Sequence, residues 1–271
     1  MSAEIFDSQL RRLRRDRAAR GFEPFLRDAM LDGIAERLAA VRRDFRDVLD
    51  LGCADGSFAL PGASVTRIDA GAAFAQAAAG QQGDEDQPHF PDGSFDLIVS
   101  AGVLDTVNDL PGALALARRA LRPDGLFLAA FLGGSTLSTL RSVLRDVEPG
   151  VARTHPQIDV RAAGDLLVRA GFALPVADVE TLEVRYASIV GLVRDLRGTA
   201  ETNLLHTRVP LSRATFAAAA RIFADRADAG DRTPERFDIV YITGWAPAPS
   251  QPQPARRGSA SASLADALRA S

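Results

Sequence analysis

The apolar positions of the chain fall into short runs that are separated by helical patterns. Near-continuous apolar runs lie at residues 48–51, 95–100 and 126–131, and a β-branched run lies at 65–69. Strands of a parallel sheet carry such runs because helices cover both faces of the sheet. A helix is expected at residues 111–122, between two of these runs. The alternation of strands and helices predicts an α/β fold with a mostly parallel sheet.

Further helices and a pair of antiparallel strands complete the pattern. Gly171 is expected to end a helix, because the residue after a helix often adopts a left-handed conformation that glycine tolerates. Strand-like segments at residues 176–186 and 237–245 are expected to pair as an antiparallel end of the sheet. The other expected helices lie at residues 4–20, 24–43, 70–79, 133–147, 161–170, 189–196 and 213–226.

These elements divide the chain into three parts. Residues 1–46 are expected to form N-terminal helices, and residues 47–246 one α/β domain. Helical insertions at about 133–160 and 187–234 are candidates for a lid over that domain. Residues 247–271 are rich in Pro, Ser and Ala, which predicts a low-complexity tail.

The loop after the first strand carries the strongest functional signal. Asp50 ends an apolar run, and Gly52 and Gly56 follow it closely. Glycine permits a sharp turn and the close approach of a ligand. Asp69 ends the next strand, where a doubly wound sheet places a carboxylate that accepts hydrogen bonds from ribose. The pattern predicts a nucleoside-binding loop, and a plain strand-to-helix turn with a capping aspartate is the alternative.

Composition narrows the function classes. The net charge of −3 gives no general attraction to nucleic acid. All basic residues are arginine, which excludes lysine Schiff-base chemistry. The single cysteine, Cys53, excludes an internal disulfide and predicts a reducing cytoplasm. No apolar run approaches the ~18 residues of a membrane span. The arginines at residues 11–20 could indicate a transit peptide, but the acidic residues nearby argue against one. The segment is therefore expected to form a solvated basic helix, which could contact an acidic partner.

Several segments together resemble a known family. The loop at residues 48–56 resembles that of class I methyltransferases, which use S-adenosylmethionine (SAM). From Phe6 to Leu268 the chain is similar to the methyltransferase-fold assembly factors of respiratory complex I, in the alphaproteobacterial branch related to mitochondrial complex I assembly factor 5. It is also similar to the carrier-protein methyltransferases of biotin synthesis. The more specific segments are Val107-Asn108-Asp109-Leu110-Pro111, Gly133-Gly134-Ser135-Thr136-Leu137, Gly244-Trp245 and Arg257-Gly258-Ser259-Ala260.

The resemblance implies a Rossmann-like fold with a seven-stranded sheet that holds SAM at the carboxyl ends of its strands. In this family, Asp50 would lie beside the methionine end of the cofactor and Asp69 would hold the ribose. The acidic segment at residues 84–86 would flank the adenine, although a solvated acidic loop is an equal alternative. The implied cofactor-binding residues are Asp50, Gly52, Ala54, Gly56, Asp69, Glu85 and Phe90.

The chain also departs from the family pattern. Ala54 replaces a glycine of the loop. The methyl group of alanine is tolerated there only if the residue keeps a negative φ. Asp105 and Thr106 stand where relatives usually carry His-Trp, and Ser135 stands where they carry Asp.

The largest departure is a shortened half of the domain. Residues 57–63 are too few for a crossover helix, which needs ~10 or more residues. No apolar strand lies between Asp69 and Asp84, so the third strand is expected to be reduced or missing. Because this half forms the adenosine pocket, SAM binding is expected to be weak or lost.

Three residues are candidates for catalysis. Arg141 could clamp a carboxylate or a protein substrate, a surface arginine being the alternative. Glu148 could orient Arg141, and Asp105 and Glu148 are the candidates for a general base. The three histidines, His89, His155 and His206, show no ligand spacing, so no metal site is expected.

Two functions from different classes are therefore carried forward. The first is a SAM-dependent methyltransferase that acts on a protein subunit in complex I biogenesis. The second is a degenerate methyltransferase fold that acts as a non-catalytic assembly chaperone. A carrier-protein methyltransferase is a third, weaker option. No nucleic-acid partner is expected.

Overall fold

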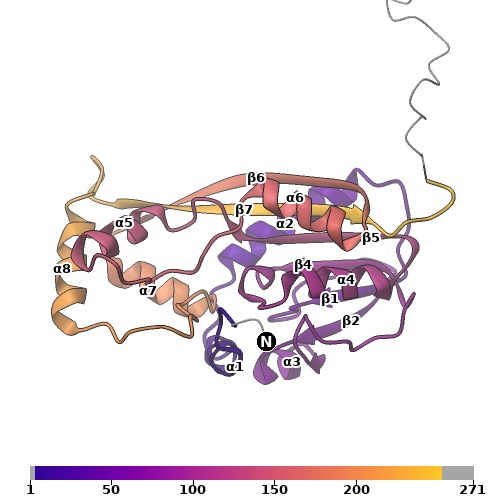
Figure 1. The fold of residues 1–271 in the computed structure, drawn as a ribbon, viewed down its shortest axis with the longest axis horizontal. Helices are drawn as coiled ribbons and strands as arrows, with labels where there is room; N and C mark the ends of the chain where they lie inside the picture. Colours follow the sequence, from indigo (N-terminus) through magenta and orange to yellow (C-terminus); the bar gives the residue numbers. More distant parts are fainter. Residues whose placement is uncertain (1–3, 252–271) are drawn as a thin grey trace, which may run out of the picture.

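The computed structural model of the chain describes residues 4–251, in which seven strands form one sheet (Figure 1). The strand order is β3-β2-β1-β4-β5-β7-β6. The strands are β1 (Asp47–Leu51), β2 (Ser64–Asp69), β3 (Gln81–Gln82), β4 (Phe95–Ala101), β5 (Leu121–Gly133), β6 (Ala173–Tyr186) and β7 (Thr233–Trp245). The helices are α1 (Ser8–Ala18), α2 (Phe25–Ala39), α3 (Ala72–Ala77), α4 (Leu110–Ala120), α5 (Ser138–Val147), α6 (Val160–Ala170), α7 (Ile189–Gly198) and α8 (Arg213–Ala224), with a 3-10 turn η1 (Leu104–Thr106).

The sheet has a parallel part and an antiparallel end. Strands β3, β2, β1, β4 and β5 run parallel, whereas β7 is antiparallel to both β5 and β6. The predicted Rossmann-like α/β class is therefore confirmed, and so is the antiparallel end.

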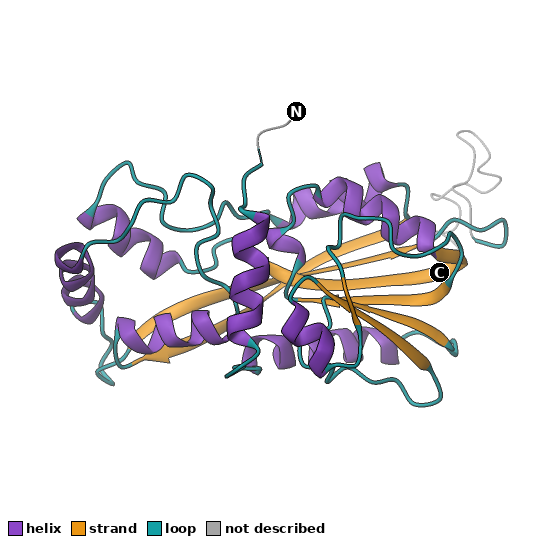
Figure 2. Cartoon of the chain, turned by 90° about the horizontal axis from the view of Figure 1, so that it is seen from below, coloured by secondary structure: helices purple, strands orange, loops and turns teal. Residues whose placement is uncertain are grey.

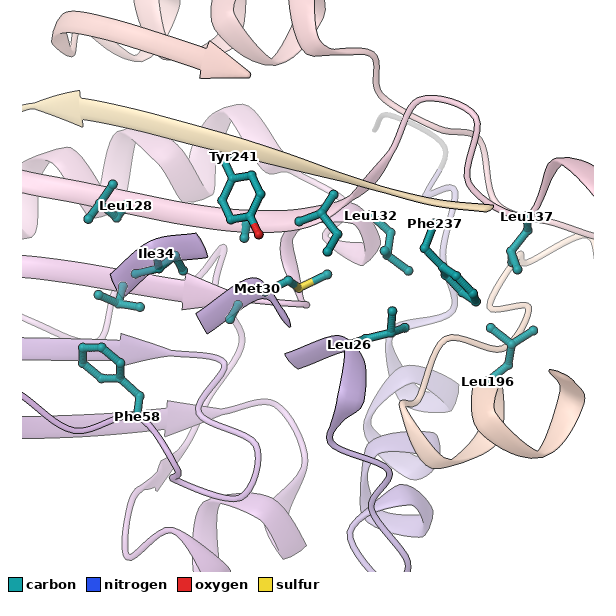
Figure 3. Close-up of a cluster of buried hydrophobic side chains, with 14 of the residues drawn as sticks. Leu26, Met30, Ile34, Phe58, Leu128, Leu132, Leu137, Leu196, Phe237 and Tyr241 are labelled. Carbon is teal, nitrogen blue, oxygen red and sulfur yellow. The ribbon is translucent and has the colours of Figure 1, made fainter. Parts of the chain in front are cut away.

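Alternate residues of each strand face two separate hydrophobic layers. Val48, Leu97 and Leu128 face the layer that α2, α5, α7 and α8 cover, whereas Leu49 and Ile98 face α4 and α6. Figure 2 shows helices on both sides of the twisted sheet, and Figure 3 shows the first layer around Met30 and Tyr241. This double coverage is the reason that the central strands are apolar on both faces.

Strands β6 and β7 extend beyond the parallel strands. In Figure 1 they reach the end of the molecule where α5, α7 and α8 gather. Helices α5 and α7 pack on this extension, and α8 packs on both of them. None of the helices described between residues 4 and 251 combines the length and apolarity that a membrane span requires.

The shortened half of the domain is present as expected. Residues 52–63, all of them described, hold no helix, and β3 has two residues. Without a crossover helix after β1, this end of the sheet has less cover than a doubly wound domain usually provides.

Several element boundaries differ from the expected ones. Helix α1 begins at Ser8 because the Asp7 side chain accepts a hydrogen bond from the N–H of Leu10. Helix α5 begins at Ser138, later than expected, because β5 continues to Gly133 in its pairing with β7. The expected tail at 247–271 lies outside the described residues from position 252 onward, and so does the segment 257–260.

Gly33 in α2 provides a test of the packing on the first layer. A methyl group on Gly33 would overlap the phenol ring of the buried Tyr241. Gly33→Ala is expected to lower the free energy of unfolding by about 1–3 kcal/mol, because overpacking outweighs the gain in helix propensity. Urea denaturation measures the change.

Gly164 in α6 is the matched control, because a methyl group there meets the Ala177 side chain at an ordinary 3.6 Å. Gly164→Ala is expected to raise the free energy of unfolding by up to about 1 kcal/mol. Equal stability of the two variants would contradict the described contact between α2 and β7.

Candidate functional site

The carboxyl ends of β1 and β2 flank the loop at residues 52–56, which turns through left-handed conformations. Gly52 has φ +83° and Gly56 φ +73°. Ala54 has φ +45°, so the expectation of a negative φ at this position is wrong. A methyl group on Gly52 would overlap Val103. The turn and the packing of Val103 therefore explain this glycine without a ligand.

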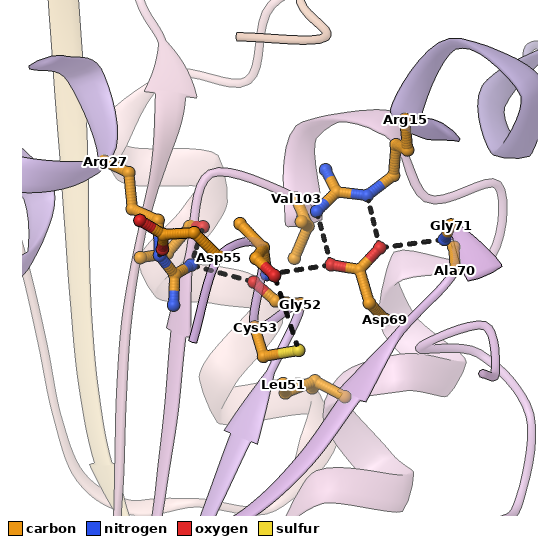
Figure 4. Close-up of polar contacts among 12 residues, drawn as sticks. Arg15, Arg27, Leu51, Gly52, Cys53, Asp55, Asp69, Ala70, Gly71 and Val103 are labelled. Atoms are coloured by element: carbon orange, nitrogen blue, oxygen red, sulfur yellow. Dashed lines mark hydrogen bonds and ion pairs between the residues drawn. The ribbon is translucent and has the colours of Figure 1, made fainter. Parts of the chain in front are cut away.

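Asp69, at the end of β2, is fully buried and holds Arg15 of α1 (Figure 4). Arg15 Nε donates to Oδ1 over 2.7 Å, and Nη2 donates to Oδ2 over 2.6 Å. The backbone N–H groups of Gly71 and Ala54 donate to the same carboxylate over 2.8 and 2.9 Å. Burial alone would raise the pKa of Asp69, but Arg15 and these backbone donors outweigh it and hold the pKa below its usual value.

Asp50, at the end of β1, holds Arg27 of α2 in a similar way. Arg27 Nη2 donates to both carboxylate oxygens, over 3.1 and 3.0 Å. Arg27 Nη1 donates to the carbonyls of Gly52 and Ala101 over 2.8 and 3.0 Å. Burial raises the pKa of Asp50 although Arg27 opposes it. Arg27 therefore ties together the ends of β1 and β4.

Glu85 is the third buried carboxylate with an arginine partner. Arg11 Nη1 donates to Oε2 over 2.7 Å, and Arg11 Nε donates to Thr106 over 3.0 Å. Glu85 is 3% exposed, so the solvated-loop alternative is wrong for this residue. The neighbouring Asp84 pairs with the more exposed Arg12.

The expected solvated basic helix is therefore wrong for one face of α1. Arg11 and Arg15 are four residues apart, which places both side chains on the same helical face. They are 5% and 6% exposed. Burying a charge is favourable only with a partner, and the acidic residues at the strand ends supply it. The spacing of these arginines is the sequence signal that could have indicated this arrangement.

The space left beside the three pairs is too small for SAM. A cavity of about 20 Å³ remains beside Arg15, Arg27 and Ala54, and one of about 50 Å³ beside Glu85 and Phe90. Pockets for ligands of this size typically measure about 300–1,000 Å³. Both oxygens of Asp69 already accept two hydrogen bonds each. As arranged here, the residues do not fit the cofactor that the fold implies.

A larger cavity lies elsewhere, between α5, α7 and α8. This helical cavity measures about 240 Å³ and adjoins an open groove of about 660 Å³. Glu201 lies in its wall and also in the wall of the small cavity beside Ala54. The two spaces therefore meet at one carboxyl group. Other residues of the helical cavity are Arg14, Leu140, Leu144, Arg153, His155, Val193 and Phe216.

Asp105, His155 and Glu201 lie together at this junction, with one ligand atom of each within 4.8 Å of the others. Burial raises the pKa of Asp105 to about 6, and burial followed by the charge of Asp105 raises the pKa of Glu201. His155 Nε2 accepts the N–H of Leu204 over 2.8 Å, and burial lowers the pKa of His155 to about 4. His155 and Glu201 therefore line the helical cavity with Asp105 next to them, and burial favours the uncharged form of all three groups. Wide separation along the chain hid this cluster from the sequence.

The proposed pairing of Arg141 with Glu148 is wrong. Arg141 Nη2 donates to the Thr136 carbonyl over 2.9 Å. Glu148 instead pairs with Arg153 at 2.5 Å. Catalytic roles for Arg141 and Glu148 stay predictions. Asp109 caps the start of α4, where its side chain accepts a hydrogen bond from the N–H of Gly112 over 2.9 Å.

The raised pKa of Asp105 leads to a prediction about pH. A carboxyl whose folded pKa lies above its unfolded value contributes stability at low pH and loses it as the pH rises through the folded pKa. Asp105→Asn is therefore expected to gain stability relative to the wild type between pH 4 and 7, as measured by urea denaturation across that range. The exposed Asp92→Asn serves as control, and a pH-independent difference for Asp105→Asn would contradict the burial argument.

Comparison with known proteins identifies the family. A family model described as "Methyltransferase domain" matches residues 22–174. The arginine-hydroxylase NDUFAF5 of Danio rerio is 33% identical, with 97% of this chain and 89% of that protein covered. The human protein of the same name is 34% identical, with 97% and 83% covered. The malonyl-[acyl-carrier protein] O-methyltransferase of Laribacter hongkongensis is 32% identical, with 86% and 87% covered.

Solved structures agree at the level of the fold. The YcgJ protein of Bacillus subtilis aligns with a TM-score of 0.56 at 15% identity, over 80% of this chain and 97% of that one. A putative methyltransferase of Bacillus halodurans aligns with a TM-score of 0.57 at 14% identity, over 80% and 98%. The chain belongs to the methyltransferase domain family and is related along nearly its whole length to the NDUFAF5 arginine-hydroxylases.

Proposed function

We propose that this chain is a bacterial cytoplasmic enzyme that modifies a protein subunit during the biogenesis of respiratory complex I. The observation that carries the proposal is the junction of the helical cavity with the loop at residues 52–56, at Glu201. A cavity of about 240 Å³ that opens into a groove of about 660 Å³ suits one side chain of a polypeptide whose flanking residues lie in the groove.

The carboxyl groups at the junction suit a polar or cationic side chain. A substrate side chain that enters the helical cavity passes apolar residues of α5 and α7 and then meets Glu201. Asp105 lies behind Glu201 and is buried. Such a carboxyl pair recognises hydrogen-bond donors, because each donor satisfies a carboxyl oxygen that has lost contact with solvent. We assign contact with the substrate to Glu201 and support of that contact to Asp105.

Two modification reactions are supported by different relatives. The name arginine-hydroxylase belongs to relatives that match 97% of the chain, which favours oxidation of a side chain. The O-methyltransferase relatives favour methyl transfer, for which SAM would be held by Asp50, Asp69 and Glu85 and would supply the methyl group. No step of methyl transfer follows from the described arrangement, because these three carboxylates already form ion pairs with arginines.

A non-catalytic assembly chaperone is the second candidate. The observation that favours it is the occupation of the implied cofactor site by Arg11, Arg15 and Arg27. In this case the groove and the helical cavity would hold a segment of an immature subunit without changing it.

Mass spectrometry of complex I subunits distinguishes these functions. In a strain that lacks the protein, the enzyme proposal predicts that one subunit loses the mass of an oxygen atom or of a methylene group. A chaperone predicts unchanged subunit masses and reduced complex I content. Unchanged masses with normal complex I content would contradict both proposals.

Variants of α7 test the helical cavity. Val193 lines the cavity, so Val193→Trp is expected to abolish the modification by filling it. Val190 lies on the same helix and is 52% exposed, so Val190→Trp should retain the wild-type level of modification. Complementation of the deletion strain, followed by the same mass measurement, compares the two. Full modification by the Val193→Trp protein would remove the cavity from the mechanism.

A further inference from the structure

We propose that α1 is an intramolecular occupant of the implied cofactor site, and that α1 and S-adenosyl compounds bind there in mutually exclusive states. The proposal concerns access to the site and holds for any reaction that the enzyme carries out. It rests on the geometry of α1 and not on the assignment of a substrate.

The first argument is the match between arginines and carboxylates. Arg15 binds Asp69 and Arg11 binds Glu85, so α1 supplies a partner to two of the three acidic residues that the fold assigns to the cofactor. The third, Asp50, binds Arg27 at the start of the next helix. All six side chains are less than a tenth exposed.

The second argument is saturation of the hydrogen bonds of Asp69. Each of its oxygens accepts one N–H from Arg15 and one backbone N–H, from Gly71 or Ala54. A carboxylate offers about four acceptor positions. A ribose hydroxyl therefore finds no free acceptor on Asp69 until Arg15 leaves.

The third argument is that α1 can leave without breaking the sheet. The described contacts place α1 outside the sheet, beside α3 and α7. Its apolar contacts lie at its two ends: Leu10 packs with Phe6, Leu204 and Leu205, and Ala18 packs with Ala54, Phe74 and Ala200.

The segment before α1 provides a further attachment, in addition to the contacts of Arg12 with Asp84 and of Asp16 with the N–H of Ala73. The Asn108 side chain accepts the N–H of Phe6 and donates to its carbonyl, each over 2.9 Å. Phe6 also forms a bridge with Leu205, in the loop that follows Glu201. Release of α1 would therefore disturb the same loop that borders the helical cavity.

Calorimetric titration with S-adenosylhomocysteine tests the proposal. When a site is closed in most molecules, the apparent affinity equals the affinity of the open site multiplied by the fraction of molecules that are open. Arg15→Gln removes the bidentate contact with Asp69 and is expected to bind the ligand at least about tenfold more tightly than the wild type. The matched control is Arg17→Gln, an exposed arginine of the same helix, which should bind like the wild type.

A second variant keeps the test valid if Arg15→Gln does not fold. Asn108→Ala loosens the attachment of Phe6 and leaves all three carboxylates with their arginines, and it too is expected to bind more tightly than the wild type. Wild-type binding as tight as that of the folded variants would overturn the proposal. The absence of binding by every folded variant would overturn it as well, because the site would then be permanently closed.

Discussion

The structure depends on the cost of burying charge. Asp50 and Asp69 stand at the ends of buried strands and Glu85 follows the short β3, and all three are buried, so an unpaired carboxylate at these positions would be strongly unfavourable. Each pairs with an arginine from the first two helices, and in the Arg15–Asp69 pair the planar guanidinium donates two parallel hydrogen bonds. These contacts fix the N-terminal helices on the carboxyl edge of the sheet.

The shortened half of the domain explains why α1 fits there. Residues 52–63 contain no crossover helix and β3 has only two residues. This edge of the sheet therefore lacks the helix that would otherwise cover it. Helix α1 packs against α3 and beside the loop at residues 52–56, and its arginines fill the space. Membership of the methyltransferase family describes the fold, whereas the chemistry depends on whether this space can open.

The helical cavity is separated from that space by Glu201. Because β6 and β7 extend beyond the parallel strands, α5, α7 and α8 have a surface on which to pack away from the cofactor edge. The cavity between them therefore survives while the adenosine site is closed. The two spaces share one wall at Glu201.

The sequence by itself determined the strands, the antiparallel pair and the missing crossover helix, because strand burial and loop length are local properties. Spacing alone identified Asp50 and Asp69 as strand-end carboxylates. The tertiary structure decided their partners: Arg15 and Asp69 are 54 residues apart, and Asp105, His155 and Glu201 come from three separate segments. It also decided that Ala54 adopts a positive φ and that Glu148 binds Arg153 instead of Arg141. Pairs such as Arg15 with Asp69 depend on which distant segments the fold brings together, and a local pattern of residue types does not record that.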